Sequence, residues 1–142
     1  MEKKYSLFIF DTAGQERYHS MPVNGIILVA DLNNRESFDN IKKWLKDIND
    51  NFENPCLVLF WNKADLKDKY QITSEEAKKY AEENKLMYFE TSAKTNQGIN
   101  EGFSYIVNQA YKSAEQKLND KRNIIVENNK RKTTKSKCSS SK

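Results

Sequence analysis

Residues 56–65 read CLVLFWNKAD, an apolar run that turns polar at Asn62. A nearly continuous apolar run that contains aromatic and β-branched residues is typical of a strand covered on both faces of a sheet. The four residues from 62 to 65 then fall in the loop that follows the strand. In parallel sheets flanked by helices, ligands bind at this carboxyl edge. The stretch therefore predicts a buried strand with a candidate binding loop at its end.

Three further apolar runs, residues 4–11, 26–31 and 87–91, are also predicted strands. Segments with apolar residues at helical spacing follow the second, third and fourth strands. Thr73 and Glu76 form a capping box at the start of the second helix. This order of elements predicts an α/β domain with a mostly parallel sheet and helices on both faces. Apolar stripes on the first and last helices are expected to pack on the sheet, and they comprise Phe38, Ile41, Trp44, Leu45 and Ile48, then Phe103, Ile106, Val107, Ala110, Tyr111 and Ala114.

The composition fits one soluble domain, since 37% of the 142 residues are hydrophobic and 31% are charged. No segment reaches the ~20 consecutive apolar residues of a membrane-spanning helix. The four glycines are not spaced for a G-x-x-x-x-G-K phosphate loop or for a dinucleotide fingerprint. Two cysteines are too few for a disulfide scaffold or a zinc cluster, which favours the reducing cytosol.

Charge divides the chain into a body, residues 1–117, and a tail, residues 118–142. The tail carries a formal charge of +6, whereas the body carries −2. The tail is rich in Ser, Thr, Asn and Lys, and we expect it to be largely disordered, with disorder from Glu127 onward. No aromatic residue interleaves the tail's charges, which argues against nucleic-acid binding.

The loop after residue 61 has the groups needed to recognise a guanine ring. An ionised Asp65 accepts two hydrogen bonds from adjacent N–H donors, which is the pattern that guanine presents and adenine does not. Asn62 can tie neighbouring loops together, and the Lys63 stem can lie over a ring face. Alone, four residues of this pattern are a weak match.

Two more polar segments follow predicted strands. In residues 11–16, Asp11 can hold magnesium through water, Gly14 can offer its N–H to a phosphate oxygen, and Gln15 can orient an attacking water. In residues 90–94, the small residues Ser92 and Ala93 allow their backbone N–H groups to reach a base oxygen, while Lys94 covers the other ring face. Each segment alone is also compatible with an ordinary polar turn. Their common order, each at a strand end, is much more specific: FDTAGQERY at residues 10–18, NKAD at 62–65 and ETSAK at 90–94.

With these motifs the chain resembles the Ras-like small GTPases, and among them the Rab branch, over residues 4–114. Ser37, Phe38 and Trp44 also match that branch. The resemblance implies a partial G domain in residues 1–117, a switch that binds GTP or GDP with magnesium and acts in vesicular membrane traffic. It also implies exchange factors, GTPase-activating proteins and effectors as partners. The implied roles are magnesium association for Asp11, γ-phosphate sensing for Gly14, catalytic water positioning for Gln15, and guanine binding for Asn62, Lys63, Asp65, Ser92, Ala93 and Lys94.

The sequence departs from that family before residue 4 and near residue 22. The family's first strand, phosphate loop, first helix, first switch and second strand have no counterpart here, and about two turns of the second switch helix are missing. Each missing charge-assisted hydrogen bond to phosphate is worth roughly 1.5–3 kcal/mol. We therefore expect a truncated chain that retains guanine specificity and is impaired in GTP hydrolysis. The alternative is a non-catalytic remnant that acts only as an interaction module.

The end of the tail offers a lipidation candidate. Rab-type chains end in cysteines that receive prenyl groups, and Cys138 is the cysteine near this end. The last four residues do not form a C-a-a-X frame. One lipid beside the tail's lysines would suit the two signals needed for anionic membranes, which predicts a cytoplasmic protein peripheral on the cytosolic face of endomembranes. A basic tail without a lipid is the other interpretation.

Overall fold

The computed structural model describes residues 6–12 and 23–137, and the side chains of these up to residue 122. The elements in chain order are β1 (Gly25–Asp31), α1 (Arg35–Asn51), β2 (Cys56–Asn62), the 3-10 turn η2 (Lys67–Lys69), α2 (Ser74–Glu83), β3 (Met87–Glu90) and α3 (Ile99–Lys137). The strands predicted at residues 26–31, 56–61 and 87–91 are confirmed to within one residue at each end. The three predicted helices are confirmed as well.

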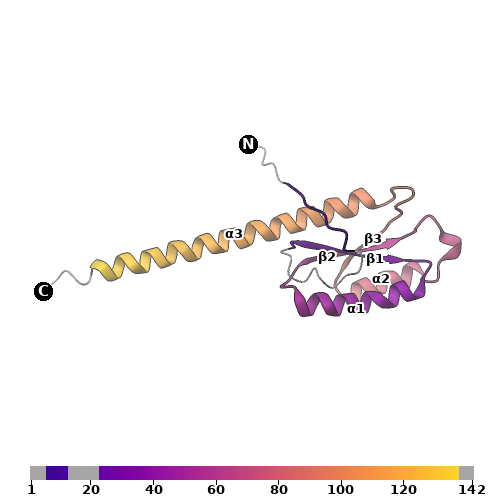
Figure 1. Cartoon of the computed structure of the whole chain (residues 1–142), viewed down its shortest axis with the longest axis horizontal. Helices are drawn as coiled ribbons and strands as arrows, with labels where there is room; N and C mark the ends of the chain where they lie inside the picture. Colours follow the sequence, from indigo (N-terminus) through magenta and orange to yellow (C-terminus); the bar gives the residue numbers. More distant parts are fainter. Residues whose placement is uncertain (1–5, 13–22, 138–142) are drawn as a thin grey trace.

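The sheet is parallel, with the strand order β1-β2-β3. Its register pairs Gly25 with Cys56 and Asp31 with Asn62, so β1 and β2 end side by side. Helices α1 and α2 cover one face of the sheet and α3 covers the other, as Figure 1 shows. The predicted α/β architecture with helices on both faces is therefore confirmed. Its consequence is that the loops after the strands gather at one edge.

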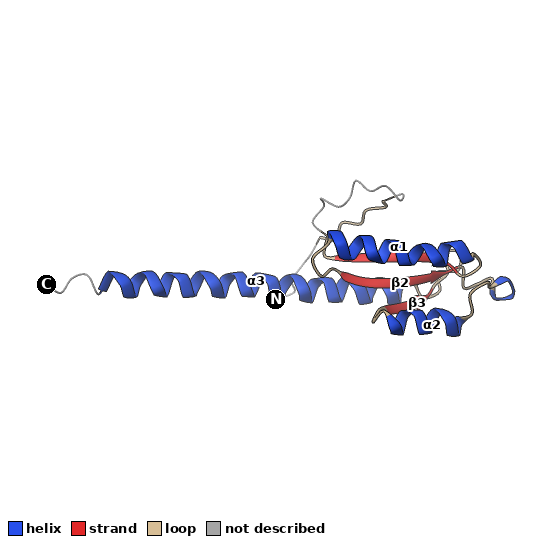
Figure 2. Ribbon diagram, turned by 90° about the horizontal axis from the view of Figure 1, so that it is seen from below, coloured by secondary structure: helices blue, strands red, loops and turns tan. Residues whose placement is uncertain are grey.

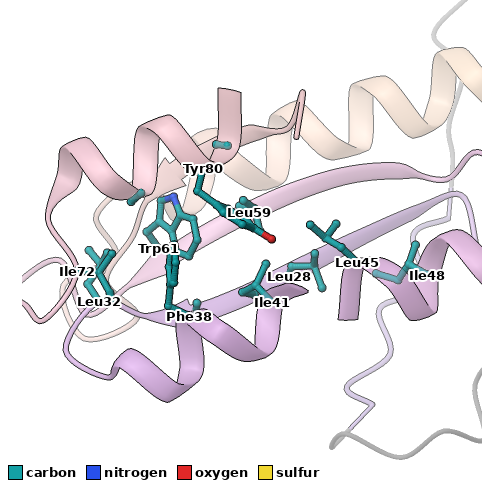
Figure 3. Packing of buried hydrophobic residues seen from close by; sticks show 13 residues of the cluster. Leu28, Leu32, Phe38, Ile41, Leu45, Ile48, Leu59, Trp61, Ile72 and Tyr80 are labelled. Carbon is teal, nitrogen blue, oxygen red and sulfur yellow. The ribbon is translucent and has the colours of Figure 1, made fainter. Parts of the chain in front are cut away.

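Most of the core lies between the sheet and the helices α1 and α2 (Figure 3). The Trp61 ring stacks on Phe38 at 5.5 Å between centroids, and Tyr80 meets Phe38 edge-on at 5.1 Å. A smaller cluster under α3 contains Val58, Phe60 and Ile106. Because β2 supplies buried side chains to both clusters, its run of apolar residues is continuous rather than alternating.

The apolar stripe of α1 is narrower than predicted. Phe38, Ile41, Leu45 and Ile48 are buried, but 40% of Trp44 is exposed. At 3.6 residues per turn, Trp44 falls at the edge of the stripe that the buried residues of α1 form. The assignment of Trp44 to the core was therefore wrong, and Val107 of α3, 37% exposed, is a similar case.

The helix starts follow from capping side chains. Asn34 caps α1 by accepting hydrogen bonds from the N–H groups of Glu36 and Ser37. Thr73 caps α2 by accepting from the Glu76 N–H at 3.1 Å, as the predicted capping box requires. The Glu76 carboxylate instead accepts from Arg35 Nη1 at 2.6 Å, which links α2 to α1.

The strand predicted at residues 4–11 is wrong for residues 6–11, the part of it that the structure describes. These residues have no regular structure, and Leu7, Phe8, Ile9 and Phe10 are 53–77% exposed. A strand needs a hydrogen-bonded neighbour, and within the described residues β1 pairs only with β2. In the arrangement that the resemblance implies, another strand separates residues 4–11 from β1. An apolar run predicts burial but cannot supply that partner.

The tail also differs from the prediction of disorder, because α3 continues as a helix to Lys137. Residues 118–137 extend beyond the sheet as a single helix (Figure 2). No glycine or proline occurs after Gly102, so no residue type that breaks helices interrupts the segment. The division of the chain at residue 117 stays a prediction. None of the helices in the described part of the chain has the length and apolar character that a membrane crossing requires.

Candidate functional site

The candidate site lies at the carboxyl edge of the sheet, where the loops after β2 and β3 meet. Backbone hydrogen bonds fix the two loops together: the Thr91 N–H donates to the Trp61 carbonyl at 2.8 Å, and the Ala64 N–H donates to the Thr91 carbonyl at 2.9 Å. Lys63 has a φ of 62°, in the left-handed region, which turns the chain sharply at the end of β2. The turn directs the residues that follow it toward the loop after β3.

A hollow of about 290 Å³ opens between these two loops. Leu66 lines this hollow together with five of the predicted site residues: Asn62, Lys63, Asp65, Ala93 and Lys94. Ser92 is fully buried behind them. The structure thus brings two separate sequence motifs, 31 residues apart at Asn62 and Ala93, to one place. Leu66 was not predicted; as the first apolar residue after the NKAD motif it could have been found by extending that motif.

Ser92 holds the Asp65 carboxylate in position. The Ser92 hydroxyl donates to Asp65 Oδ1 at 2.6 Å and accepts from the Thr95 N–H at 3.2 Å. The hydrogen bond from Ser92 lowers the pKa of Asp65 below its ordinary value and outweighs the opposing effect of desolvation. Asp65 is therefore an anion at neutral pH. Its two oxygens have about four acceptor positions, of which Ser92 takes one.

The backbone amides expected to bind a base oxygen already have partners. The Ala93 N–H donates to Asn62 Oδ1 at 3.2 Å, and the Ser92 N–H donates to the Gln97 carbonyl at 3.0 Å. The first bond confirms that Asn62 ties the two loops together. A base oxygen can take the Ala93 amide only by replacing Asn62 Oδ1. The Ser92 amide belongs to a backbone bridge between residues 92 and 97 and is not offered to the hollow.

The loop from Thr91 to Gly98 is held in a tight turn. Gly98 has a φ of +66°, and a Cβ placed on it would lie closer than 3.0 Å to the Glu90 carbonyl oxygen. Only glycine combines this conformation with so close an approach of two backbones. Gly98 therefore closes the turn that places Ser92, Ala93 and Lys94 beside the end of β2.

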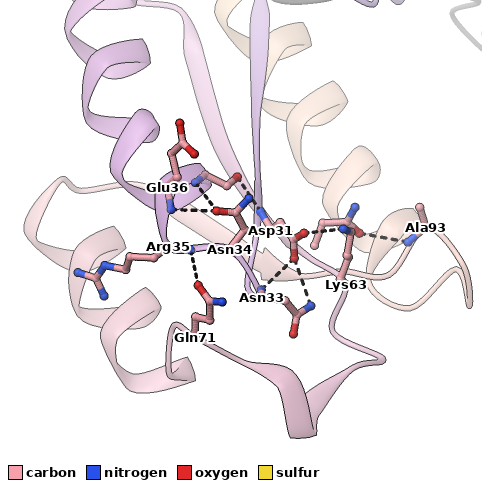
Figure 4. Close-up of polar contacts among 10 residues, drawn as sticks. Asp31, Asn33, Asn34, Arg35, Glu36, Lys63, Gln71 and Ala93 are labelled. Atoms are coloured by element: carbon pink, nitrogen blue, oxygen red, sulfur yellow. Dashed lines mark hydrogen bonds and ion pairs between the residues drawn. The ribbon is translucent and has the colours of Figure 1, made fainter.

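A contact that the sequence did not predict joins β1 to the site. Lys63 Nζ lies 2.5 Å from Asp31 Oδ2, at the end of the neighbouring strand (Figure 4). Asp31 Oδ1 also accepts hydrogen bonds from the N–H and the Nδ2 of Asn33, at 2.9 and 3.2 Å. Burial tends to raise the pKa of Asp31, but the hydrogen bonds from Lys63 and Asn33 outweigh it and lower that pKa. The sequence signal that could have drawn attention to Asp31 was an acidic residue at the end of an apolar strand.

The other predicted site residues are not placed in this hollow. Asp11 lies in the exposed segment 6–12 and is not among the residues that line the hollow. Gly14, Gln15 and Cys138 lie outside the described residues. No group of three or more His, Cys, Asp or Glu side chains in residues 6–12 and 23–122 is arranged to hold a metal ion.

Comparison with known proteins places this arrangement in a family. Residues 1–112 match the model of the Ras family. The chain belongs to the Ras family. It is 36% identical to the Ras-related protein Rab-10 of Diplobatis ommata over 131 residues, which cover 87% of the chain and 66% of that protein. It is 34% identical to the Ras-related protein Rab-8B of Homo sapiens over an alignment that covers 96% of the chain and 73% of Rab-8B.

A third relative is the Ras-related protein Rab5 of Nicotiana tabacum, which is 45% identical over 102 residues. These residues cover 67% of the chain and 51% of that protein. Together the three relatives show that this member of the Ras family is of the Rab type. The chain spans between 51% and 73% of the length of these relatives.

Proposed function

We propose that the hollow between residues 62–66 and 93–94 binds a guanine base, and that the chain is a Rab-type switch that binds GTP or GDP. One observation carries the proposal. Asp65 and Ala93 line one hollow. Ser92 holds the Asp65 carboxylate in place, and the Ala93 amide donates to Asn62 Oδ1, which a base oxygen can replace. The family membership supports the same ligand. The Rab relatives support a role in vesicular membrane traffic.

Guanine fits the polar groups of the hollow in a way that adenine does not. The guanine edge has two adjacent N–H donors for a carboxylate, and beside them a carbonyl oxygen for an amide. Adenine presents an acceptor where guanine has a donor, so adenine would leave the Asp65 carboxylate desolvated and without a partner. The alkyl stems of Lys63 and Lys94, which both line the hollow, provide apolar surface for the ring faces.

The proposal for this chain by itself covers binding of the guanine base and does not include hydrolysis of GTP. The sequence contains no G-x-x-x-x-G-K stretch to surround the phosphates. Asp11, the residue expected to associate with magnesium, does not line the hollow. Gly14 and Gln15 keep their proposed roles as phosphate sensor and water-positioning residue in the G domain of the family. Affinity in this chain then comes from the base and is expected at millimolar nucleotide.

The proposed partners follow from the Rab type. They are exchange factors, GTPase-activating proteins and effectors, and an anionic membrane for the basic tail. A prenyl group on Cys138 beside the tail's lysines would provide the two signals that stable attachment needs. The proposed location is therefore the cytosolic face of endomembranes.

Ligand-observed NMR of the purified chain with GDP and with ADP tests the proposal. We expect saturable binding of GDP at millimolar concentration and no comparable binding of ADP. Asp65→Asn removes the charge and should abolish the preference for guanine. Asp50→Asn, the same change on the exposed surface of α1, is the matched control and should retain it. Absence of a guanine preference in the parent chain would refute the proposal and favour the alternative of an interaction module.

A further inference from the structure

The Lys63 ammonium at the hollow is not a free cation. It is ion-paired at 2.5 Å with Asp31, a residue of β1 that does not itself line the hollow. The Lys63 side chain is 53% exposed and the Asp31 side chain only 21%. The ion pair therefore joins the half-exposed Lys63 side chain at the hollow to the more buried Asp31 carboxylate on the adjacent strand, which we call the anchor.

The anchor is itself held firmly. The backbone N–H of Asp31 donates to Ser37 Oγ at 3.0 Å, which ties the strand end to the first turn of α1. Asn33 donates twice to Asp31 Oδ1, so Oδ2 is the oxygen that faces Lys63. The parallel register places Asp31 opposite Asn62, the residue before Lys63. These contacts leave the carboxylate little freedom to move away from the ammonium.

We propose that Asp31 is a positioning residue for guanine binding, an inference that rests on the proposed function. Asp31 holds the ammonium of Lys63 at the strand ends, so that the methylene stem of Lys63 lies along the wall of the hollow. A purine ring then meets apolar surface instead of a mobile charge.

Asp65 is an alternative partner for Lys63, and this is why the contact with Asp31 matters. Asp65 lies two residues along the chain and lines the same hollow. Without Asp31, the Lys63 ammonium is free to pair with the Asp65 carboxylate. It would then occupy the acceptor positions that the guanine N–H groups need. Asp31 thus keeps the base-reading carboxylate available.

Asp31→Asn is the informative substitution, because asparagine keeps an oxygen for the Asn33 N–H and removes the charge. We expect this variant to bind GDP about three- to tenfold more weakly than the parent chain. The same substitution in a Lys63→Met chain should change GDP binding little, since no ammonium remains to be positioned. A purely structural role for Asp31 predicts an equal loss in both backgrounds. Asp50→Asn is the charge-matched control.

Each outcome of these titrations decides a different point. The inference is supported if Asp31→Asn weakens GDP binding in the chain with Lys63 and does not weaken it in the Lys63→Met chain. Equal GDP binding by the parent and by Asp31→Asn, or equal losses in both backgrounds, overturns the inference and leaves the proposed function standing. Absence of guanine-selective binding by the parent overturns both. The NMR signals of the Lys63 ε-methylene give a readout without nucleotide: its two protons should be distinct in the parent and averaged in Asp31→Asn, and averaged signals in both would overturn the anchoring.

Discussion

Replacing Gly98 with alanine should destabilise the fold and displace the loop that carries Ser92, Ala93 and Lys94. The added Cβ would lie closer than 3.0 Å to the Glu90 carbonyl oxygen, which belongs to β3 and cannot swing aside as a flexible side chain would. At a φ of +66° an alanine also costs roughly 1–2 kcal/mol because of its left-handed backbone. With the clash added, we expect the free energy of unfolding to fall by about 2–4 kcal/mol.

Gly25→Ala is the matched control for this substitution. A Cβ on Gly25 would meet Ile106 Cγ1 at 2.9 Å, but this contact is with a side chain, at the opposite end of β1 from the site. We expect Gly25→Ala to reduce the free energy of unfolding less and to leave GDP binding by the folded chain unchanged. Gly98→Ala should weaken GDP binding even where the chain remains folded, because the loop holding Ser92 and Ala93 must shift.

Urea unfolding followed by tryptophan fluorescence measures both variants, since Trp61 is fully buried in the core. A loss of less than about 0.5 kcal/mol for Gly98→Ala would refute the reasoning, because surface changes without a structural role fall within that range. Unchanged GDP binding by Gly98→Ala would show that the turn does not position the site.

Three other predictions concern the core, a helix cap and the pH dependence of binding. Ile41→Ala, at a side chain 1% exposed, should lower the free energy of unfolding by about 2–4 kcal/mol in urea titrations, and a loss below 1 kcal/mol would contradict the described packing of α1. Thr73→Ala should lower the free energy of unfolding by about 1 kcal/mol in the same assay. Thr73→Ser keeps the capping hydroxyl and should retain most of that free energy. Because Ser92 lowers the pKa of Asp65, GDP binding should persist below the ordinary aspartate pKa and disappear as the pH falls through the lowered value. Ser92→Ala should move that loss to higher pH, and an unchanged pH profile would rule out the role of Ser92.

The sheet and the base-binding loop could be predicted because their signals are local. The apolar run at residues 56–61 required burial on both faces, and the polar residues directly after it had to lie at the carboxyl edge. Once β2 and β3 were parallel, the loops bearing Asp65 and Ser92 had to meet. Family-specific spacing added the identity of the ligand, which the residues alone left open.

The errors and omissions depend on contacts that sequence patterns do not contain. Residues 6–11 are apolar enough for a strand, but pairing needs a neighbour that no local pattern specifies. The contact of Lys63 with Asp31 depends on the register of β1 against β2, which the sequence alone does not give. The Ala93 amide could be proposed as a donor, but only coordinates reveal that Asn62 already accepts from it. The helical tail reflects local propensity, which the high charge of residues 118–142 obscured.

The central claim is that guanine binds in the hollow by replacing Asn62 Oδ1 at the Ala93 amide. The backbone ¹H–¹⁵N spectrum of the chain, titrated with guanosine and separately with adenosine, tests it most directly. The claim predicts that the amide signals of Ala93 and Lys94 shift with guanosine, saturate together, and do not move with adenosine. Equal shifts with both nucleosides, or guanosine shifts confined to residues outside 62–66 and 91–95, would contradict it.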